Sequence, residues 1–241
     1  MTHINRRHCL AGLAAGASIA VAGRISFSHA ADKIMPDEKS VLLVIDVQNC
    51  FLPGGSLAVN DGDAIIPVIN ELAKKFENVV MTQDWHTPGH ISFASSHEGK
   101  NPFDTIELPY GTQVLWPDHC VMGTESAELA AGLDIPHAQL IIRKGYHSEV
   151  DSYSTFLEAD KSTRTGLTGY LRERGLERVY ACGLATDFCV SWSAIDAAAA
   201  DLEVSVIEDA CRGIDIDGSV DAAWENMAKA GIARLQSSDF A

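Results

Sequence analysis

Three side chains in the sequence are of the types that nucleophilic catalysis requires: the thiol of Cys189, the carboxylate of Asp46 and the amine of Lys144. A cysteine thiol has a pKa of about 8.5, so a thiolate at neutral pH needs an adjacent base or the dipoles of a helix N-terminus. Asp46 can act as the base, while Lys144 keeps it ionised and supports the thiolate. A cysteine taken alone is more often a small core residue, and only its combination with Asp46 and Lys144 favours catalysis.

A second group of residues has the character of a metal site. In extended chain, Asp84 and His86 point to the same side, which suits the binding of one divalent cation. His119 and His90 are the candidates for a third ligand. Such oxygen and nitrogen ligands suit zinc, iron or manganese without distinguishing among them. The alternative is that Asp84 and His86 only form hydrogen bonds within a loop.

The elements that must position these residues alternate along the chain. Six short apolar runs are typical of strands covered on both faces: 41–45, 78–82, 139–142, 178–182, 203–207 and 233–235. Four stretches predict helices: 63–76, 163–174, a nearly apolar and buried 188–200, and 219–230. Ser219 is the expected N-cap of the last helix, and Gly175 is an expected C-cap. The alternation predicts a three-layer αβα fold, with a doubly wound, mostly parallel sheet of about six strands.

In a sheet of this kind, ligands bind beyond the carboxyl ends of the strands. The first four predicted strands carry these side chains to that edge, in chain order: Asp46, Asp84 with His86, Lys144, and Cys189. No Gly-x-Gly-x-x-Gly loop follows any strand, which argues against an NAD-dependent dehydrogenase.

Composition restricts the class of partner. The chain has 241 residues, 46% of them hydrophobic, and a formal net charge of −15. This size fits one domain with a sizeable core. The acidity argues against nucleic acid and anionic membrane surfaces, which require a basic face, and so favours a small-molecule substrate. The composition is compatible with a homo-oligomer.

The first thirty residues differ from the rest. They contain Arg6, Arg7 and Arg24 but no Asp or Glu. The Arg6-Arg7 pair precedes an uncharged stretch, 10–23, that is too short and weak for a stable membrane anchor, and residues 28–30 form a small-x-small cleavage signal. We predict that residues 1–30 are a twin-arginine export signal cut after Ala30, and that 31–241 form one periplasmic domain. The alternative is an uncut extension on a cytoplasmic protein.

Loss of that signal would remove Cys9. Five cysteines would remain: Cys50, Cys120, Cys182, Cys189 and Cys211. An odd number in a chain with a large core predicts free thiols rather than a disulfide framework.

Five motifs, taken together and in order, resemble those of bacterial nicotinamidases, also called pyrazinamidases, of the isochorismatase-like hydrolase superfamily. The resemblance covers about residues 40–236. The motifs are Asp46-Val47-Gln48-Asn49-Cys50-Phe51, Thr82-Gln83-Asp84-Trp85-His86, Trp116-Pro117-Asp118-His119-Cys120-Val121, Arg143-Lys144-Gly145 and Gly183-Leu184-Ala185-Thr186-Asp187-Phe188-Cys189-Val190. Many members carry Asp where this chain has Cys50, which adds a second thiol near the site.

The resemblance implies a set of roles. The catalytic triad would be Asp46, Lys144 and Cys189, and one divalent metal would be held by Asp84, His86 and His119, with His90 as a further candidate. A substrate slot would lie between Phe51 and Trp116, with Tyr153 and Leu57 nearby. A cis peptide between Leu184 and Ala185 would place the N–H groups of Ala185 and Cys189 as an oxyanion hole.

The implied reaction is hydrolysis of nicotinamide to nicotinate and ammonia through a cysteine thioester, with pyrazinamide as an expected second substrate. One alternative is another cysteine amidohydrolase of the superfamily, acting on N-carbamoyl or ureido compounds; these relatives typically lack the Asp-x-His pair. A non-enzymatic periplasmic protein that binds metal or nicotinamide is the other.

Overall fold

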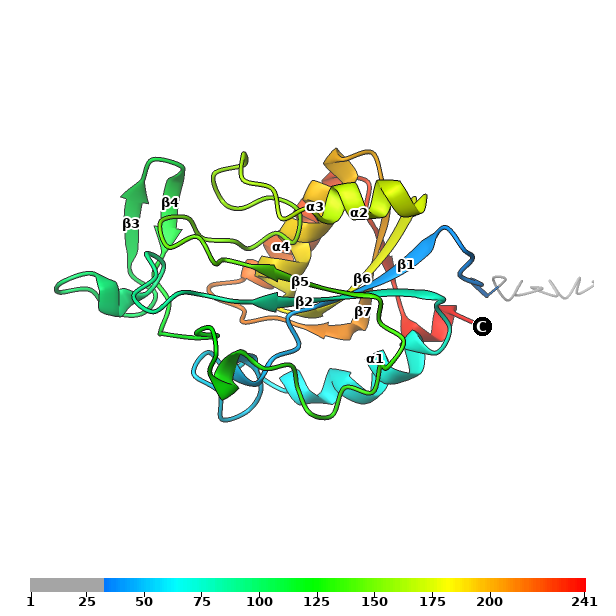
Figure 1. The fold of residues 1–241 in the computed structure, drawn as a ribbon, viewed down its shortest axis with the longest axis horizontal. Helices are drawn as coiled ribbons and strands as arrows, with labels where there is room; N and C mark the ends of the chain where they lie inside the picture. Colours follow the sequence, from blue (N-terminus) through cyan, green and yellow to red (C-terminus); the bar gives the residue numbers. More distant parts are fainter. Residues whose placement is uncertain (1–32) are drawn as a thin grey trace, which may run out of the picture. The chain divides into compact units, whose positions relative to one another are not determined.

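The computed structural model describes residues 33–241 (Figure 1). These residues form one compact unit. The export signal predicted for residues 1–30 lies outside the described residues, so the signal, the boundary after Ala30 and the periplasmic destination stay predictions. Among the described helices, none has the length and apolar character needed to cross a membrane.

The centre of the fold is a six-stranded sheet in which all neighbouring strands are parallel, in the order β5-β2-β1-β6-β7-β8. All six predicted strands are confirmed: β1 (Ser40–Ile45), β2 (Asn78–Asp84), β5 (Leu140–Lys144), β6 (Arg178–Leu184), β7 (Glu203–Arg212) and β8 (Ala233–Leu235). Every residue of β1 is buried, as its aliphatic sequence requires when both faces of a strand are covered.

The strand order places a switch point between β1 and β6. From β1 the chain adds β2 and β5 on one side, whereas β6, β7 and β8 extend the sheet on the other. The loops that follow β1 and β6 therefore diverge and leave a crevice at their carboxyl ends. Gly183 allows the close pairing there: it has a φ of 121°, and a Cβ would lie 2.1 Å from the Ile45 carbonyl oxygen.

Four helices cover the two faces of the sheet, which confirms the three-layer fold. They are α1 (Ile66–Ala73), α2 (Leu167–Arg174), α3 (Ser191–Ala199) and α4 (Ser219–Lys229). In Figure 1, α1 lies below the sheet and the other three lie above it. Shorter helical turns occur at Asn49–Phe51, Gly62–Ile65, Ala94–Ser96, Glu125–Ala127, Thr186–Val190 and Ser237–Asp239.

The first three helices begin later than the sequence pattern predicts. A 3₁₀ turn occupies Gly62–Ile65, and a π-helical turn occupies Thr186–Val190 ahead of α3. Residues 163–165 bond to the preceding segment instead of entering α2, since the Glu158 N–H donates to the Thr163 carbonyl. The predicted C-cap at Gly175 is confirmed. The predicted N-cap at Ser219 is wrong.

The N-cap of α4 is Gly218, whose left-handed φ of 82° suits a glycine. The Ser219 hydroxyl is used elsewhere: it accepts the Ile216 N–H at 2.8 Å and donates to the Asp187 carboxylate. The side chain therefore ties the loop before α4 to the turn that carries Cys189.

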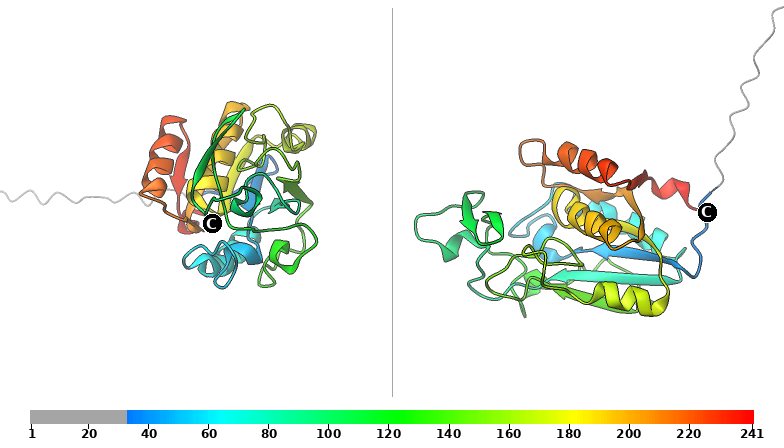
Figure 2. Two further views of the ribbon diagram at one scale, coloured as in Figure 1. Left: turned by 90° about the vertical axis from the view of Figure 1, so that its left-hand side faces the viewer. Right: turned by 90° about the horizontal axis from the view of Figure 1, so that it is seen from above.

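A two-stranded hairpin, β3 (Thr105–Leu108) and β4 (Gly111–Val114), was absent from the predicted elements. Its strands are short and mostly exposed, so neither gives a long apolar run. Figures 1 and 2 show it standing away from the central sheet, at the end toward which β2 and β5 point. The hairpin is therefore placed at the edge where the predicted site residues gather.

Candidate active site

A fully buried ammonium group, that of Lys144 at the end of β5, lies at the centre of this edge. Its Nζ forms ion pairs with Asp46 Oδ2 at 3.0 Å and with Asp84 Oδ1, and it donates to the Ser152 carbonyl at 2.7 Å. It also donates to Cys189 Sγ at 3.3 Å. Parallel pairing of β2 with β5 sets Asp84 directly opposite Lys144, so strand register brings the charges together.

The pKa values of the two carboxyl groups beside Lys144 are shifted in opposite directions. Burial tends to raise the pKa of both. At Asp84, the charges of Lys144, His86 and His119 overcome burial and hold the pKa below its ordinary range. At Asp46, burial prevails over Lys144, and the Asp84 charge adds to it, so the pKa is raised above 3.8. Asp84 is therefore the ionised partner of the ammonium, and Asp46 is the better proton acceptor.

Cys189 lies buried in the π-helical turn, just before α3. Burial raises the pKa of its thiol well above the ordinary value, and Lys144 offsets this only in part. The protonated thiol is therefore favoured over the thiolate, and an adjacent base is needed to remove its proton. The sulfur and a carboxylate oxygen of Asp46 lie within 4.8 Å of each other, so Asp46 is placed to accept the thiol proton.

Two polar side chains of the sequence motifs fix this geometry, and sequence reasoning assigned them no role. The Thr82 hydroxyl donates to Asp46 Oδ1 at 2.5 Å and accepts the Asp46 N–H at 3.1 Å. The Gln48 amide accepts the Asp84 N–H and donates to the Asp84 carbonyl, both at 2.8 Å. They join the loop after β1 to the end of β2, next to the left-handed turn at Asp46, which has a φ of 48°.

Asp84, His86 and His119 come together as the sequence predicts, with one donor atom from each within 4.8 Å of the others. His119 Nδ1 lies 2.8 Å from the Pro117 carbonyl, which leaves Nε2 facing Asp84 Oδ2 at 3.8 Å. His86 Nε2 lies 3.4 Å from Asp151 Oδ1, and its buried Nδ1 has no partner among the described residues. Each ring thus keeps one nitrogen free while the other is held by an oxygen, as in metal-ligating histidines.

His90 belongs to a different arrangement. Its ring centroid lies 4.5 Å from that of His86, but it groups with His86 and Asp151 rather than with Asp84 and His119. Both ring nitrogens are engaged, Nδ1 by the Ser92 N–H and Nε2 with the His147 carbonyl. Burial lowers the pKa of His90 to about 4, so the ring is neutral at pH 7.

Asp151 was not among the predicted site residues; it lies in the loop after β5, 65 residues from His86. Besides contacting His86, it accepts a hydrogen bond at 2.6 Å from Gln113, the buried residue of β4. Burial raises the pKa of Asp151, but its contact with His86 outweighs this and lowers the value to about 2. No spacing rule links a residue in an irregular loop to a distant histidine, so the sequence carried no signal for this pair.

The four predicted substrate contacts line one small cavity. Its walls include Phe51, Leu57, Trp116, Tyr153, Asp84, His119, Asp151, Ala185, Phe188, Cys189 and Ile214. Phe188 meets Trp116 edge-on at 4.9 Å between ring centroids, and Trp116 Nε1 donates to the Tyr153 hydroxyl at 3.1 Å. The expected cis peptide between Leu184 and Ala185 is present. The cavity therefore joins aromatic walls to both the thiol and the candidate metal ligands.

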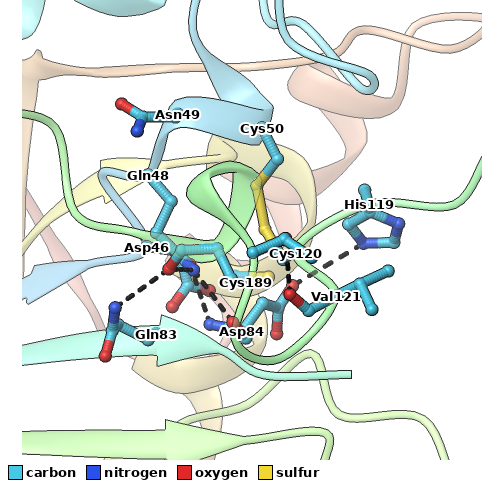
Figure 3. Close-up of a disulfide and its surroundings, with 12 residues drawn as sticks. Asp46, Gln48, Asn49, Cys50, Gln83, Asp84, His119, Cys120, Val121 and Cys189 are labelled. Carbon is cyan, nitrogen blue, oxygen red and sulfur yellow. Dashed lines mark hydrogen bonds and ion pairs between the residues drawn. A yellow bond between two sulfur atoms is a disulfide. The ribbon is translucent and has the colours of Figure 1, made fainter. Parts of the chain in front are cut away.

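The prediction of free thiols is wrong for two cysteines. Cys50 and Cys120 form a disulfide with their Cα atoms 5.6 Å apart (Figure 3). Among the described residues, Cys182, Cys189 and Cys211 are free. The number of cysteines does not show which of them pair. Cys50 and Cys120 lie 70 residues apart in sequence, and their loops meet only in the fold.

Comparison with known proteins agrees with this geometry. Residues 40–239 match the isochorismatase domain. The chain is 61% identical over 196 residues to the nicotinamidase of Acinetobacter baylyi, covering 81% of this chain and 92% of that one. The chain belongs to the nicotinamidases of the isochorismatase family.

Two solved structures of the family extend the match. The nicotinamidase and pyrazinamidase of Acinetobacter baumanii superposes with a TM-score of 0.84 at 60% identity, covering 84% of this chain and 98% of the other. The pyrazinamidase of Pyrococcus horikoshii, solved in complex with zinc, gives a TM-score of 0.68 at 36% identity, covering 82% and 99%. Nearly the whole of each related structure is therefore represented in this chain.

The buried ammonium yields the first prediction. Replacement Lys144→Met should remove the cation from two buried carboxyl groups, Asp46 and Asp84, and lower the free energy of unfolding by about 3–5 kcal/mol at pH 7. Loss of the ammonium should raise the folded pKa of Asp46 further above its unfolded value, so part of the loss should be regained as the pH falls. Urea unfolding of chelator-treated protein at pH 7 and pH 5 measures both effects.

Lys39→Met is the matched control, because Lys39 pairs with Glu177 at the surface. It should change stability by no more than about 1 kcal/mol. Equal unfolding midpoints for Lys144→Met and Lys39→Met would contradict the central role of Lys144.

Asp151 yields the second prediction. Asp151→Asn removes the carboxylate that holds His86 Nε2. Zinc affinity should fall by about 10–100-fold, because the ring loses its orienting acceptor. Titration calorimetry of metal-free protein measures this, with Glu149→Gln, an exposed carboxylate in the same loop, as control. An unchanged zinc Kd in Asp151→Asn would show that the contact does not orient the ring.

Proposed function

We propose that this chain is a nicotinamidase, hydrolysing nicotinamide to nicotinate and ammonia through a thioester on Cys189. The proposal is carried by one observation: the buried thiol, which lies beside Asp46 and Lys144, lines the same cavity as Asp84 and His119, two of the three residues of the donor set. The relatives that carry the name nicotinamidase support this choice of substrate.

The donor atoms fit a divalent cation, since the set comprises one carboxylate and two imidazoles with free nitrogens. We favour zinc because the relative from Pyrococcus horikoshii was solved with zinc, although the donors also suit iron and manganese. When bound, the ion would supply a Lewis-acidic contact that orients the pyridine nitrogen of the substrate.

The acylation step follows from the proton affinities of the buried cluster. Asp46, with its raised pKa, takes the proton of Cys189, and the Lys144 ammonium stabilises the thiolate. The thiolate attacks the carboxamide carbon, and the N–H groups of Ala185 and Cys189 stabilise the oxyanion. Asp46 returns the proton to the leaving nitrogen, which departs as ammonia.

The deacylation step uses the same carboxylate. Asp46 removes a proton from water, the resulting hydroxide cleaves the thioester, and nicotinate leaves as the Cys189 thiol is restored. The aromatic walls, Phe51 and Trp116 among them, favour a flat heteroaromatic ring, which also suits pyrazinamide. A linear N-carbamoyl compound would make little use of these walls.

Ammonia release by the purified protein tests the function. The wild-type chain with zinc should release ammonia from nicotinamide and from pyrazinamide, and should lose this activity on chelation. Cys189→Ala should release no ammonia while binding zinc with unchanged affinity, because the proposed ligands are Asp84, His86 and His119 and not the thiol. Cys182→Ala, which removes another buried free thiol, should keep the activity.

Two other outcomes of this assay would each support one of the alternative functions. Turnover of N-carbamoyl substrates without turnover of nicotinamide would favour the other amidohydrolases of the superfamily. Binding of nicotinamide without ammonia release by the wild type would indicate a binding protein.

We also propose that the enzyme is exported to the periplasm by the twin-arginine signal at residues 1–30. The Arg6-Arg7 pair and the small residues at 28–30 support this proposal. Expression of the full chain in a bacterium with a twin-arginine translocase should give periplasmic protein that begins at Ala31. Replacement of both arginines by lysine should retain the protein, uncut, in the cytoplasm. Cytoplasmic protein with an intact N-terminus in both cases would refute export.

A further inference from the structure

We propose that the Cys50–Cys120 disulfide is a positioning element that holds the metal ligand His119 against the substrate wall Phe51. Oxidation of this cysteine pair then sets the affinity of the site for its cation. The inference rests on the proposed function for its effect on turnover, whereas its effect on metal binding is independent of the substrate.

The position of the bridge in the chain is the first argument. Cys50 precedes Phe51 in the turn after β1, and Cys120 follows His119 directly. Both cysteines are fully buried. Figure 3 shows the sulfur–sulfur bond running between the two loops, above Asp84 and beside His119. The covalent link therefore lies one residue from a cavity wall at one end and one residue from a metal ligand at the other.

The contacts around the bridge extend its effect to a second ligand. The Cys120 carbonyl accepts the His86 N–H at 3.0 Å, and the His86 carbonyl accepts the Met122 N–H at 2.8 Å. The rings of Phe51 and His119 lie 5.6 Å apart between centroids. The segment carrying Cys120 thus sets the backbone of His86 as well as that of His119.

Among the described residues, the disulfide is the one direct bond between the two segments that it joins. The turn after β1 is otherwise bonded to residues 125–130, where the Asn49 side chain donates to the Glu125 carbonyl at 2.9 Å and the Asn49 N–H donates to the Glu128 carbonyl at 3.0 Å. Within the described part of the chain, no hydrogen bond or ion pair joins residues 47–52 to residues 117–121. The His119 ring contacts the Pro117 carbonyl of its own loop, Asp84 Oδ2 at 3.8 Å and neighbouring rings, none of which belongs to a polar group of the turn after β1. Cys120 adopts a left-handed φ of 45°, which is uncommon for a residue with a side chain. The disulfide is therefore the link nearest to both Phe51 and His119, because the hydrogen bonds between the two loops lie beyond Cys120, at residues 125–130.

Reduction should release this constraint by a defined reaction. A water-soluble phosphine attacks one sulfur, the S–S bond breaks, and water supplies the oxygen of the phosphine oxide and the two protons of the new thiols. The phosphorus is oxidised by two electrons, and Cys50 and Cys120 are reduced by two. Such a bond persists in an oxidising compartment, which agrees with the proposed export.

The test is zinc titration of the metal-free full-length chain. Compared with the oxidised wild type, the Cys50→Ser/Cys120→Ser variant should bind zinc about 10–100-fold more weakly, as when a group that orients a ligand is lost. The control Cys182→Ser/Cys211→Ser removes two buried free thiols outside the site and should keep the wild-type Kd. A wild-type Kd in the folded double variant at Cys50 and Cys120 would overturn the proposal.

A second measurement keeps the proposal testable if that variant does not fold. Wild-type protein is treated with the phosphine, and its cysteines are alkylated and mapped by mass spectrometry before and after treatment. Cys50 and Cys120 should be protected before treatment and labelled after it, and the zinc Kd should rise in parallel. Labelling of both before treatment, or reduction without a change in Kd, would overturn the proposal. Loss of ammonia release with an unchanged zinc Kd would count against it and leave the proposed function intact.

Discussion

The buried ammonium of Lys144 is the constraint on which the remaining structure depends. Its single positive charge faces Asp46, Asp84 and the thiol of Cys189, so it cannot compensate two carboxylates and a thiolate together. Asp84 takes the ionised role, and one proton is left to pass between Asp46 and Cys189. A buried ion pair is a weak source of stability, since an apolar replacement often performs as well. The cluster serves proton transfer rather than stability, because it places a carboxyl group with a raised pKa beside a protonated nucleophile.

Asp84 extends this constraint to the candidate metal centre. One of its oxygens pairs with Lys144, and the other faces His119 at 3.8 Å. The carboxylate is thereby shared between the catalytic cluster and the donor set, and strand register fixes it opposite Lys144. Gln48 holds the backbone of Asp84 from the loop after β1. A shift of β2 against β5 would therefore disturb the nucleophile and the donor set together.

The sequence could predict the residues that regular structure delivers. Short apolar runs predicted all six strands, and strand ends in a parallel sheet meet at one edge, so Asp46, Lys144 and Cys189 could be expected together. Contacts made by irregular segments could not be predicted. The pairing of Asp151 with His86, and the meeting of Cys50 with Cys120, depend on loops whose paths no periodicity encodes. The late start of α3 has a similar cause, because the apolar pattern of 188–200 does not distinguish a π turn from an α-helix.

The β3–β4 hairpin has an evolutionary consequence. It stands outside the central sheet, yet its one buried side chain, Gln113, holds Asp151 and contacts the Tyr153 hydroxyl. The two faces of this ribbon should therefore diverge at different rates: outward positions can drift or take up new recognition features, while the inward glutamine is tied to the histidine environment. A hairpin transplanted from a relative should therefore need an amide at the position of Gln113 to keep the contact with Asp151.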